Sequence, residues 1–162
     1  MKIVRLIAFI PAIIWMIIIF GFSGNNGEES SSQSYKVAKI IVDTYDSILH
    51  LDMSDEQKEA TIDNITFVVR KVAHFTEYMI LAVLFMTPFI INGLCRKKAF
   101  IISIVFVILY ASTDEIHQLF IPGRAGMVRD VIIDSCGGLL GSVCVFYVSK
   151  FIEHLHAKRH KI

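Results

Sequence analysis

The chain has 162 residues, of which 54% are hydrophobic and 19% are charged, and its formal net charge is +1. A soluble domain is about 45–50% apolar and about 25% charged, so the composition excludes an ordinary soluble domain and intrinsic disorder and indicates a membrane protein. The small net charge argues against nucleic-acid binding, and the length fits a single domain over residues 1–162.

Four apolar stretches follow one another along the chain. They cover residues 3–22, 72–91, 99–121 and 130–152. Because about 20 helical residues cross a hydrocarbon core of ~30 Å, each stretch is long enough to span a bilayer. A helix satisfies its backbone hydrogen bonds within one segment, as lipid requires. We therefore predict an all-α fold, an integral membrane four-helix bundle.

The first stretch has an alternative interpretation as a cleaved signal peptide, because Lys2 and Arg5 stand at its start. Its uncharged run, residues 6–22, is longer than the ~7–15 residues of a signal sequence. No small-x-small cleavage site follows that run. We therefore expect the stretch to remain as a membrane span.

Residues 23–66 form a polar segment between the first two spans. It opens with a stretch rich in Gly, Asn and Ser over residues 23–34, which predicts a loop. Apolar residues then recur at helical spacing, which predicts an amphipathic helix on the membrane surface or against the bundle: Val37, Ile41, Tyr45 and Ile48. Residues 54–57 resemble a capping box that opens a second helix, which could continue through Arg70 into the second span.

Basic residues predict the orientation of the spans. The short connection between the second and third spans contains Arg96, Lys97 and Lys98, and both ends of the chain are basic as well, whereas residues 23–66 are acidic. Because short cytoplasmic segments are rich in Lys and Arg, we expect both termini in the cytoplasm and residues 23–66 on the outer side of the cell membrane.

Polar residues within the spans gather at the ends that face the outer side. Charges in spans are costly and indicate function by default. Arg70, His74 and Glu77 share one helical face, as do Asp114, His117 and Gln118. On the fourth span, the line of Asp130 and Asp134 continues to glycines that let another helix approach closely, Gly137 and Gly141.

Three interpretations of this cluster remain open. The first is a structural ion-pair network, in which Arg70, Arg124 and Arg129 neutralise the nearby carboxylates. The second is a site for a polar head group, because arginine suits phosphate or carboxylate. Its candidate ligand-binding residues are Arg70, Lys71, Gln118, Arg124, Arg129, Asp130 and Asp134.

The third interpretation is acid–base catalysis or metal binding by pairs of imidazole and carboxylate groups. The candidate catalytic residues are His74, Glu77, Asp114, Glu115 and His117. The sequence leaves a metal undecided and indicates no cofactor. The three cysteines lack CxxC spacing, so neither a disulfide framework nor a zinc ribbon is predicted.

Several motifs together resemble those of the VanZ-like family. They are the segment RKVAHFTEY at residues 70–78, DEIHQ at 114–118, PGR at 122–124, Arg129-Asp130, and the Phe22-Ser23 end of the first span. The resemblance implies a small integral membrane protein of the bacterial cell envelope. The family's namesake is associated with resistance to the glycopeptide teicoplanin, and the resemblance brings no securely assigned reaction.

The residues and the resemblance lead to one hypothesis. An outward-facing cleft binds, and could modify, an anionic membrane lipid, a cell-wall lipid precursor or a teichoic-acid-type head group, and so affects teicoplanin susceptibility. The alternatives are a membrane scaffold that binds a partner without catalysis, and a metal-dependent membrane hydrolase or transferase.

Overall fold

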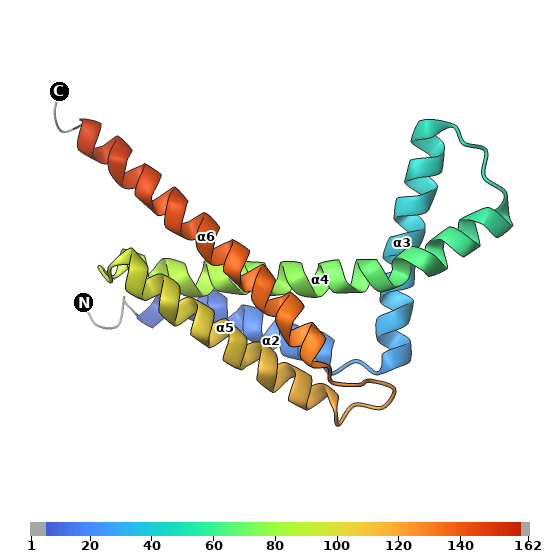
Figure 1. Cartoon of the computed structure of the whole chain (residues 1–162), viewed down its shortest axis with the longest axis horizontal. Coiled ribbons are helices and arrows are strands. Elements are labelled where there is room, and N and C mark those ends of the chain that lie inside the picture. Colours follow the sequence, from blue (N-terminus) through green and yellow to red (C-terminus); the bar gives the residue numbers. More distant parts are fainter. Residues whose placement is uncertain (1–5, 160–162) are drawn as a thin grey trace.

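The structure, a computed structural model, describes residues 6–159, and within them it is entirely helical. Its helices are α2 (Ile10–Ser23), α3 (Gly27–Leu49), α4 (Asp55–Ile91), α5 (Arg96–Gln118) and α6 (Val128–Arg159). Figure 1 shows α2, α4 and α5 along the length of the molecule, α6 crossing them, and α3 standing across one end. The all-α prediction is confirmed.

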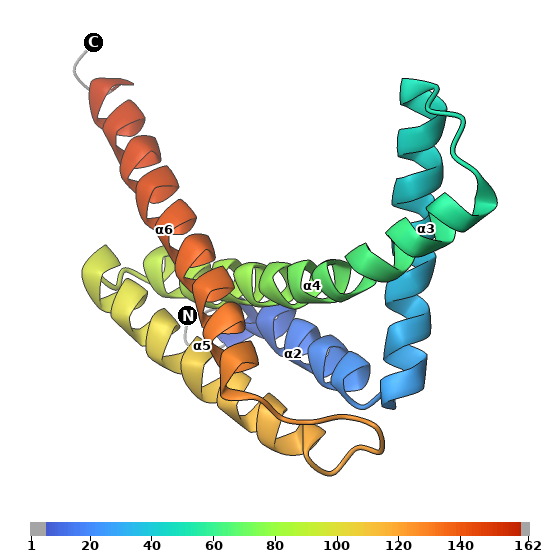
Figure 2. The same ribbon diagram turned by 45° about the vertical axis from the view of Figure 1, so that its right-hand side comes forward.

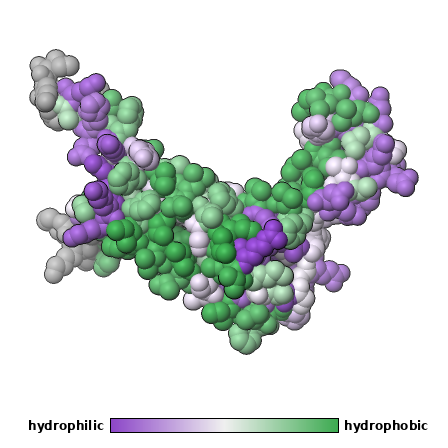
Figure 3. Space-filling model, in the orientation of Figure 1, coloured by the Kyte–Doolittle hydropathy of each residue, from purple (hydrophilic) through white to green (hydrophobic). Residues whose placement is uncertain are grey.

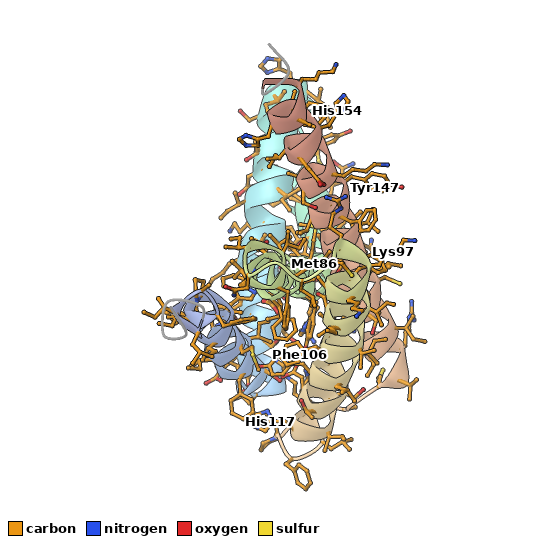
Figure 4. All side chains as sticks on the ribbon, turned by 90° about the vertical axis from the view of Figure 1, so that its left-hand side faces the viewer. Met86, Lys97, Phe106, His117, Tyr147 and His154 are labelled. Atoms are coloured by element: carbon orange, nitrogen blue, oxygen red, sulfur yellow. The ribbon has the colours of Figure 1, made fainter. Side chains whose placement is uncertain are left out.

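The helices α2, α4, α5 and α6 form the bundle. Its core joins residues that are at most 1% exposed, namely Ile19, Tyr78, Leu81, Ala82, Val107 and Ala111. Seen along the bundle, Met86 and Phe106 lie among the helices, whereas His154 lies on the end of α6 that projects beyond them (Figure 4). The second half of α6 therefore leaves the bundle that its first half helps to build.

Close contact between α4 and α6 depends on two glycines. A Cβ atom at Gly137 would collide with the carbonyl oxygen of Phe75, and one at Gly141 with the carbonyl oxygen of Met79. Only glycine permits this approach of two backbones, and the prediction that Gly137 and Gly141 pack against another helix is confirmed. We call this contact the α4–α6 seam.

The connection from α2 to α3 is much shorter than the loop predicted over residues 23–34. Asn26 and Glu29 form a capping box: the Asn26 side chain accepts from the Glu29 N–H at 2.8 Å, and Glu29 accepts from the Asn26 N–H at 3.2 Å. This box starts α3 at Gly27, so the loop prediction is wrong from that residue onward. The chain bends by 106° between α2 and α3.

The helix α3 packs against α4, but not through the apolar stripe that the sequence predicts. Its contact with α4 uses the neighbouring stripe of smaller residues, with Ala38 and Val42 buried against Ile62. The predicted stripe at Val37, Ile41, Tyr45 and Ile48 remains 47–69% exposed. The stripe therefore does not pack against the bundle, and it is free to meet lipid.

The helix α4 runs unbroken from Asp55 to Ile91 over 37 residues. The predicted capping box at its start is present, because Ser54 accepts from the Gln57 N–H and Gln57 accepts from the Ser54 N–H. One helix thus runs from the hairpin that α3 and the first part of α4 form into the bundle, as the sequence indicated. From a second angle, α3 and the first part of α4 project together from the bundle end (Figure 2).

The helix α5 ends earlier than predicted. Its last residue is Gln118, not residue 121, because Leu119, Phe120 and Ile121 donate to carbonyls three residues back in tight turns. Pro122 follows, and the residue before a proline avoids helical geometry.

Three helices are long and apolar enough to cross a membrane, α4, α5 and α6, and the bent pair α2–α3 raises the number to four. The α2 part has 14 residues, about 21 Å of helix, while residues 3–5 of the predicted first span lie outside the described residues. Figure 3 shows hydrophobic residues over the middle of the molecule and hydrophilic residues along the outer edge of the α3–α4 hairpin. The protein is a multi-pass membrane protein.

Candidate functional site

The polar residues predicted to converge do lie at one end of the bundle, where residues 119–127 connect α5 to α6. Arg124 Nε donates to the Asn25 carbonyl at 3.0 Å, and its Nη2 donates to the Phe22 carbonyl at 3.3 Å. The Gly27 N–H donates to the Pro122 carbonyl at 3.1 Å. These bonds hold the connecting loop against the α2–α3 bend.

Two further contacts fix this loop in place. Glu115 accepts a hydrogen bond from the Met127 N–H at 2.8 Å. A Cβ atom at Gly27 would collide with the carbonyl oxygen of Gly123, whose φ of +72° lies in the left-handed region. The loop therefore presents Arg124 in a defined position beside the first turn of α3.

A cleft of about 580 Å³ opens in the angle between α3 and α4, and we call it the α3–α4 cleft. Its volume lies within the roughly 300–1,000 Å³ of typical ligand sites. Its lining comes from α2, α3, α4 and the loop: Phe22, Ser30, Gln33, Ser34, Val37, Ile41, Ile65, Val68, Val69, Arg70, Val72, Ala73, His74, Glu77 and Arg124.

Two arginines in the cleft contact neutral groups. Arg70 Nη2 donates to the Ser31 hydroxyl at 2.5 Å, while Arg124 donates only to backbone carbonyls. Within residues 6–159, neither guanidinium forms an ion pair with a carboxylate. Burial and the neighbouring charge of Arg70 lower the pKa of Arg124. The two positive charges thus oppose each other, and an anion between them would relieve that repulsion.

An imidazole–carboxylate pair lies beside the arginines. His74 Nδ1 is 3.7 Å from a carboxylate oxygen of Glu77 one turn along α4, and both residues line the cleft. In the part of the chain that the structure describes, His74 Nδ1 has no hydrogen-bond partner. The pair can exchange a proton with a bound group, which keeps His74 and Glu77 as candidates for acid–base work.

Lys71 and Asp130 are brought together outside the cleft. Lys71 Nζ donates to both carboxylate oxygens of Asp130 at 2.6 Å and lies 5.1 Å from the centre of the Phe67 ring. This ion pair joins the start of α6 to α4 and extends the α4–α6 seam. The two opposite charges therefore compensate each other.

A second polar group is buried inside the bundle behind the cleft. Asp114 accepts from Gln118 at 3.2 Å, and both side chains are at most 4% exposed. Asp134 is fully buried, and its carboxylate oxygens have no partner within residues 6–159. The hydroxyls of Ser23 and Tyr78 are buried in the same place, and both interact with the Asp114 carboxylate. Charged groups in such a place require a counter-charge or a proton.

The remaining predicted residues take other places. His117 stacks on Phe20 with ring centroids 4.2 Å apart, Glu115 holds the loop, and Arg129 is exposed. Among residues 6–159, Arg70, Arg124 and Arg129 form no ion pair with a carboxylate, so the predicted network of these arginines does not form. No group of three His, Cys, Asp or Glu side chains in residues 6–159 is arranged to hold a metal ion.

The sequence interpretation missed the contribution of α3. Ser31 contacts Arg70, and five other residues of this helix line the cleft: Ser30, Gln33, Ser34, Val37 and Ile41. The signal was present in the serines that recur every four residues at Ser30 and Ser34, beside the apolar stripe. It was obscured because residues 23–34 were expected to be a loop.

Comparison with known proteins gives one match. The model of the family described as VanZ/LLP1 matches residues 8–150, which include the cleft and the seam. Neither a curated protein nor a solved structure matches the chain.

Proposed function

The chain belongs to the VanZ/LLP1 family of membrane proteins, and from that premise we propose that the α3–α4 cleft binds the anionic head group of an envelope lipid. One observation carries the proposal: Arg70 and Arg124 line the same cleft without a carboxylate partner in residues 6–159. A guanidinium presents several donors in a planar fork that matches phosphate and carboxylate oxygens.

The chemical class of the head group follows from its surroundings. The arginines supply positive charge, and Ser30, Gln33 and Ser34 supply polar groups beside them. A phosphate-bearing lipid, a cell-wall lipid precursor or a teichoic-acid-type head group meets these requirements. His74 and Glu77 adjoin the same space, so they are the residues that would act if the bound head group is modified.

The cleft lies on the outer side of the cell membrane in this proposal. Arg96, Lys97 and Lys98 begin α5 directly after its turn from α4, at the opposite end of the bundle, and basic residues that flank short connections stay in the cytoplasm. Both termini are then cytoplasmic. Lys2, Arg5 and Lys161, which the orientation also uses, lie outside the described residues.

The orientation can be measured with a membrane-impermeant maleimide on intact cells. Cys95, in the α4–α5 turn, is exposed in the structure and is expected to stay unlabelled. A Ser32→Cys variant on α3 is expected to react. Labelling of Cys95 in intact cells, with Ser32→Cys protected, would invert the orientation.

The cellular role follows from the site. A protein that retains or alters an anionic lipid on the outer surface changes the chemistry that a lipophilic glycopeptide meets there. We propose that this reduces the effect of teicoplanin. A scaffold without a ligand is the rival function, and it predicts that the cleft arginines can be replaced without a change in bound lipid.

The test is lipid co-purification measured by mass spectrometry. The variants Arg70→Gln and Arg124→Gln are expected to lose the anionic lipid that the unmodified protein retains. Arg129→Gln is the matched comparison, because Arg129 is exposed and does not line the cleft. Thermal unfolding is followed in parallel, since Arg124 also holds the loop. Identical lipid content in folded variants would refute the head-group site.

A further inference from the structure

The α3–α4 cleft has two chemically different ends. Its polar end contains Arg70, His74, Glu77 and Arg124. Its apolar end lies between α3 and the flank of α4 and is lined by Val37, Ile41, Ile65 and Val68. A soluble anion would use the first end only. The second end has the surface that a hydrocarbon chain prefers.

The apolar residues of the cleft are also partly exposed at the molecular surface. Val68 and Val72 are 55% and 57% exposed on the flank of a membrane-spanning helix, although both line the cleft. Val37 and Ile41 belong to the exposed apolar stripe of α3, and the outer edge of the α3–α4 hairpin is hydrophilic (Figure 3). The apolar lining of the cleft is therefore continuous with the exposed apolar surface of α3 and α4.

The orientation of α3 explains how the two ends meet. The bend of 106° after α2 turns α3 away from the direction of the bundle. The hydrogen bond between Arg70 and Ser31 joins the start of α3 to the polar end, while Val37 and Ile41 follow about two and three turns later. The helix α3 thus borders both the polar end and the apolar end of the cleft.

We propose that the ligand of the cleft is an intact membrane amphiphile that enters from the outer leaflet, with its anionic group at Arg70 and Arg124 and its hydrocarbon chain along Val37, Ile41 and Val68. This inference rests on the proposed head-group site, and it adds a place in the cleft for the hydrocarbon chain of the bound lipid.

Binding of the hydrocarbon chain in the cleft contributes to the selection of the ligand more than to its affinity. A hydrocarbon chain gains little by leaving lipid for an apolar groove, because both surroundings are equally apolar. The apolar lining at Val37, Ile41 and Val68, which we call the chain seat, instead holds the ligand at one depth and one orientation, so that the arginines contact its charged group. Polar side chains along the chain path would oppose this placement.

Photo-crosslinking locates the chain directly. The probe is phosphatidylglycerol with a diazirine in its acyl chain, mixed into phosphatidylcholine vesicles that contain the full-length protein. We expect residues 37–41 and 65–72 to be labelled about tenfold more than the lipid-facing flank of α5 at Ile101 and Leu109, and excess unlabelled phosphatidylglycerol should remove the difference. The α5 flank is an internal reference, since these residues are about 60% exposed and do not line the cleft.

Matched variants separate the two parts of the site. Val37→Asn with Ile41→Asn should lower the labelling of α4 residues 65–72 about tenfold, whereas Ile40→Asn, on the same helix but outside the lining, should leave it unchanged. Arg124→Gln should reduce cleft labelling to the level of the α5 flank.

The outcomes distinguish failure of the chain seat from failure of the head-group site. If cleft labelling equals that of α5 while lipid co-purification still depends on Arg124, the chain seat is wrong and the head-group site stands. If Arg124→Gln changes neither labelling nor co-purified lipid, both fail. If glycerol phosphate added in excess competes as well as phosphatidylglycerol, the ligand is a soluble anion and the inference is overturned.

Discussion

Two neighbouring positive charges on α4 have different environments, because they lie on different faces of the helix. Lys71, at the α4–α6 seam, pairs with Asp130 at 2.6 Å. Arg70, the preceding residue, lines the α3–α4 cleft and donates to the hydroxyl of Ser31, without an ion pair in the described part of the chain. Neutralised charge holds helices together, and charge without a counter-ion can receive a ligand. Adjacent residues on one helix therefore have different tasks because they face different neighbours.

The largest expected effect comes from breaking the seam pair. Lys71→Met leaves the Asp130 carboxylate, whose side chain is 13% exposed, without its partner. We expect a loss of about 3 kcal/mol in the free energy of unfolding, because removal of one member of a buried ion pair strands the other. Thermal unfolding in detergent measures this loss.

The double variant Lys71→Met with Asp130→Leu removes both charges and should recover most of that stability. Arg70→Gln is the comparison on the neighbouring face and should unfold near the temperature of the unmodified protein. Equal destabilisation by Arg70→Gln and Lys71→Met would contradict the claim that only Lys71 contributes to stability through an ion pair.

The seam can also be broken by sterics alone. Gly137→Ala places a Cβ atom on the Phe75 carbonyl and should destabilise the protein by about 2 kcal/mol through forced separation of α4 and α6. Gly21→Ala, in α2, meets nothing within 4 Å and serves as the control. A thermal shift that is the same for both variants would contradict the close contact at the seam.

A conservative substitution of Arg70 tests whether the cleft requires the shape of a guanidinium or only its charge. Arg70→Lys keeps the charge and removes the planar fork, so we expect about tenfold weaker retention of anionic lipid, equivalent to about 1.4 kcal/mol, with unfolding unchanged. Quantitative mass spectrometry of bound lipid measures the effect. Retention as strong as that of the unmodified protein would mean that positive charge alone suffices and that the donor geometry has no part.

The smallest effect is expected at the tip of the α3–α4 hairpin, outside the bundle. Lys58, at 2.8 Å, and the Met53 N–H hold the pKa of Asp46 below its usual value. Because the folded-state pKa is the lower one, the contribution of Asp46 to stability is present above the unfolded pKa of about 3.8 and is lost as the pH falls through the folded value.

The protection factor for amide hydrogen exchange near Met53, which corrects for the intrinsic pH dependence of exchange, should therefore fall below about pH 4, while protection at the seam stays high. The substitution Asp46→Asn should remove this pH dependence. If exchange in the hairpin responds to acid equally in the Asp46→Asn variant, the effect belongs to other carboxylates.

Much of the fold followed from local sequence rules. The apolar stretches, the capping box at Ser54 and the glycines at 137 and 141 each depend on nearby residues, and the structure confirms them. The start of α3 was missed although Asn26 and Glu29 have the spacing of a capping box. The abundance of Gly, Asn and Ser in that region favoured a loop over the helix.

The pairing of charges could not be predicted in the same way. Arg70 and Lys71 differ by one position, about 100° around a helix, and the sequence does not tell which of these directions faces α6. Only the tertiary arrangement places Asp130 opposite Lys71 and leaves Arg70 toward α3. The prediction that polar residues gather at one end needed only the order of the spans, and that convergence is what the structure contains.

The central claim is that Arg70 and Arg124 hold an anionic lipid, and the distance from guanidinium nitrogen to lipid phosphorus tests it most directly. Solid-state NMR on protein with ¹⁵N-labelled arginine in phosphatidylglycerol bilayers should show dephasing of guanidinium ¹⁵N signals by ³¹P. The account predicts that this dephasing falls when Arg70 and Arg124 are replaced by Gln and persists in Arg129→Gln. Dephasing that is absent, or unchanged without the two cleft arginines, would contradict it.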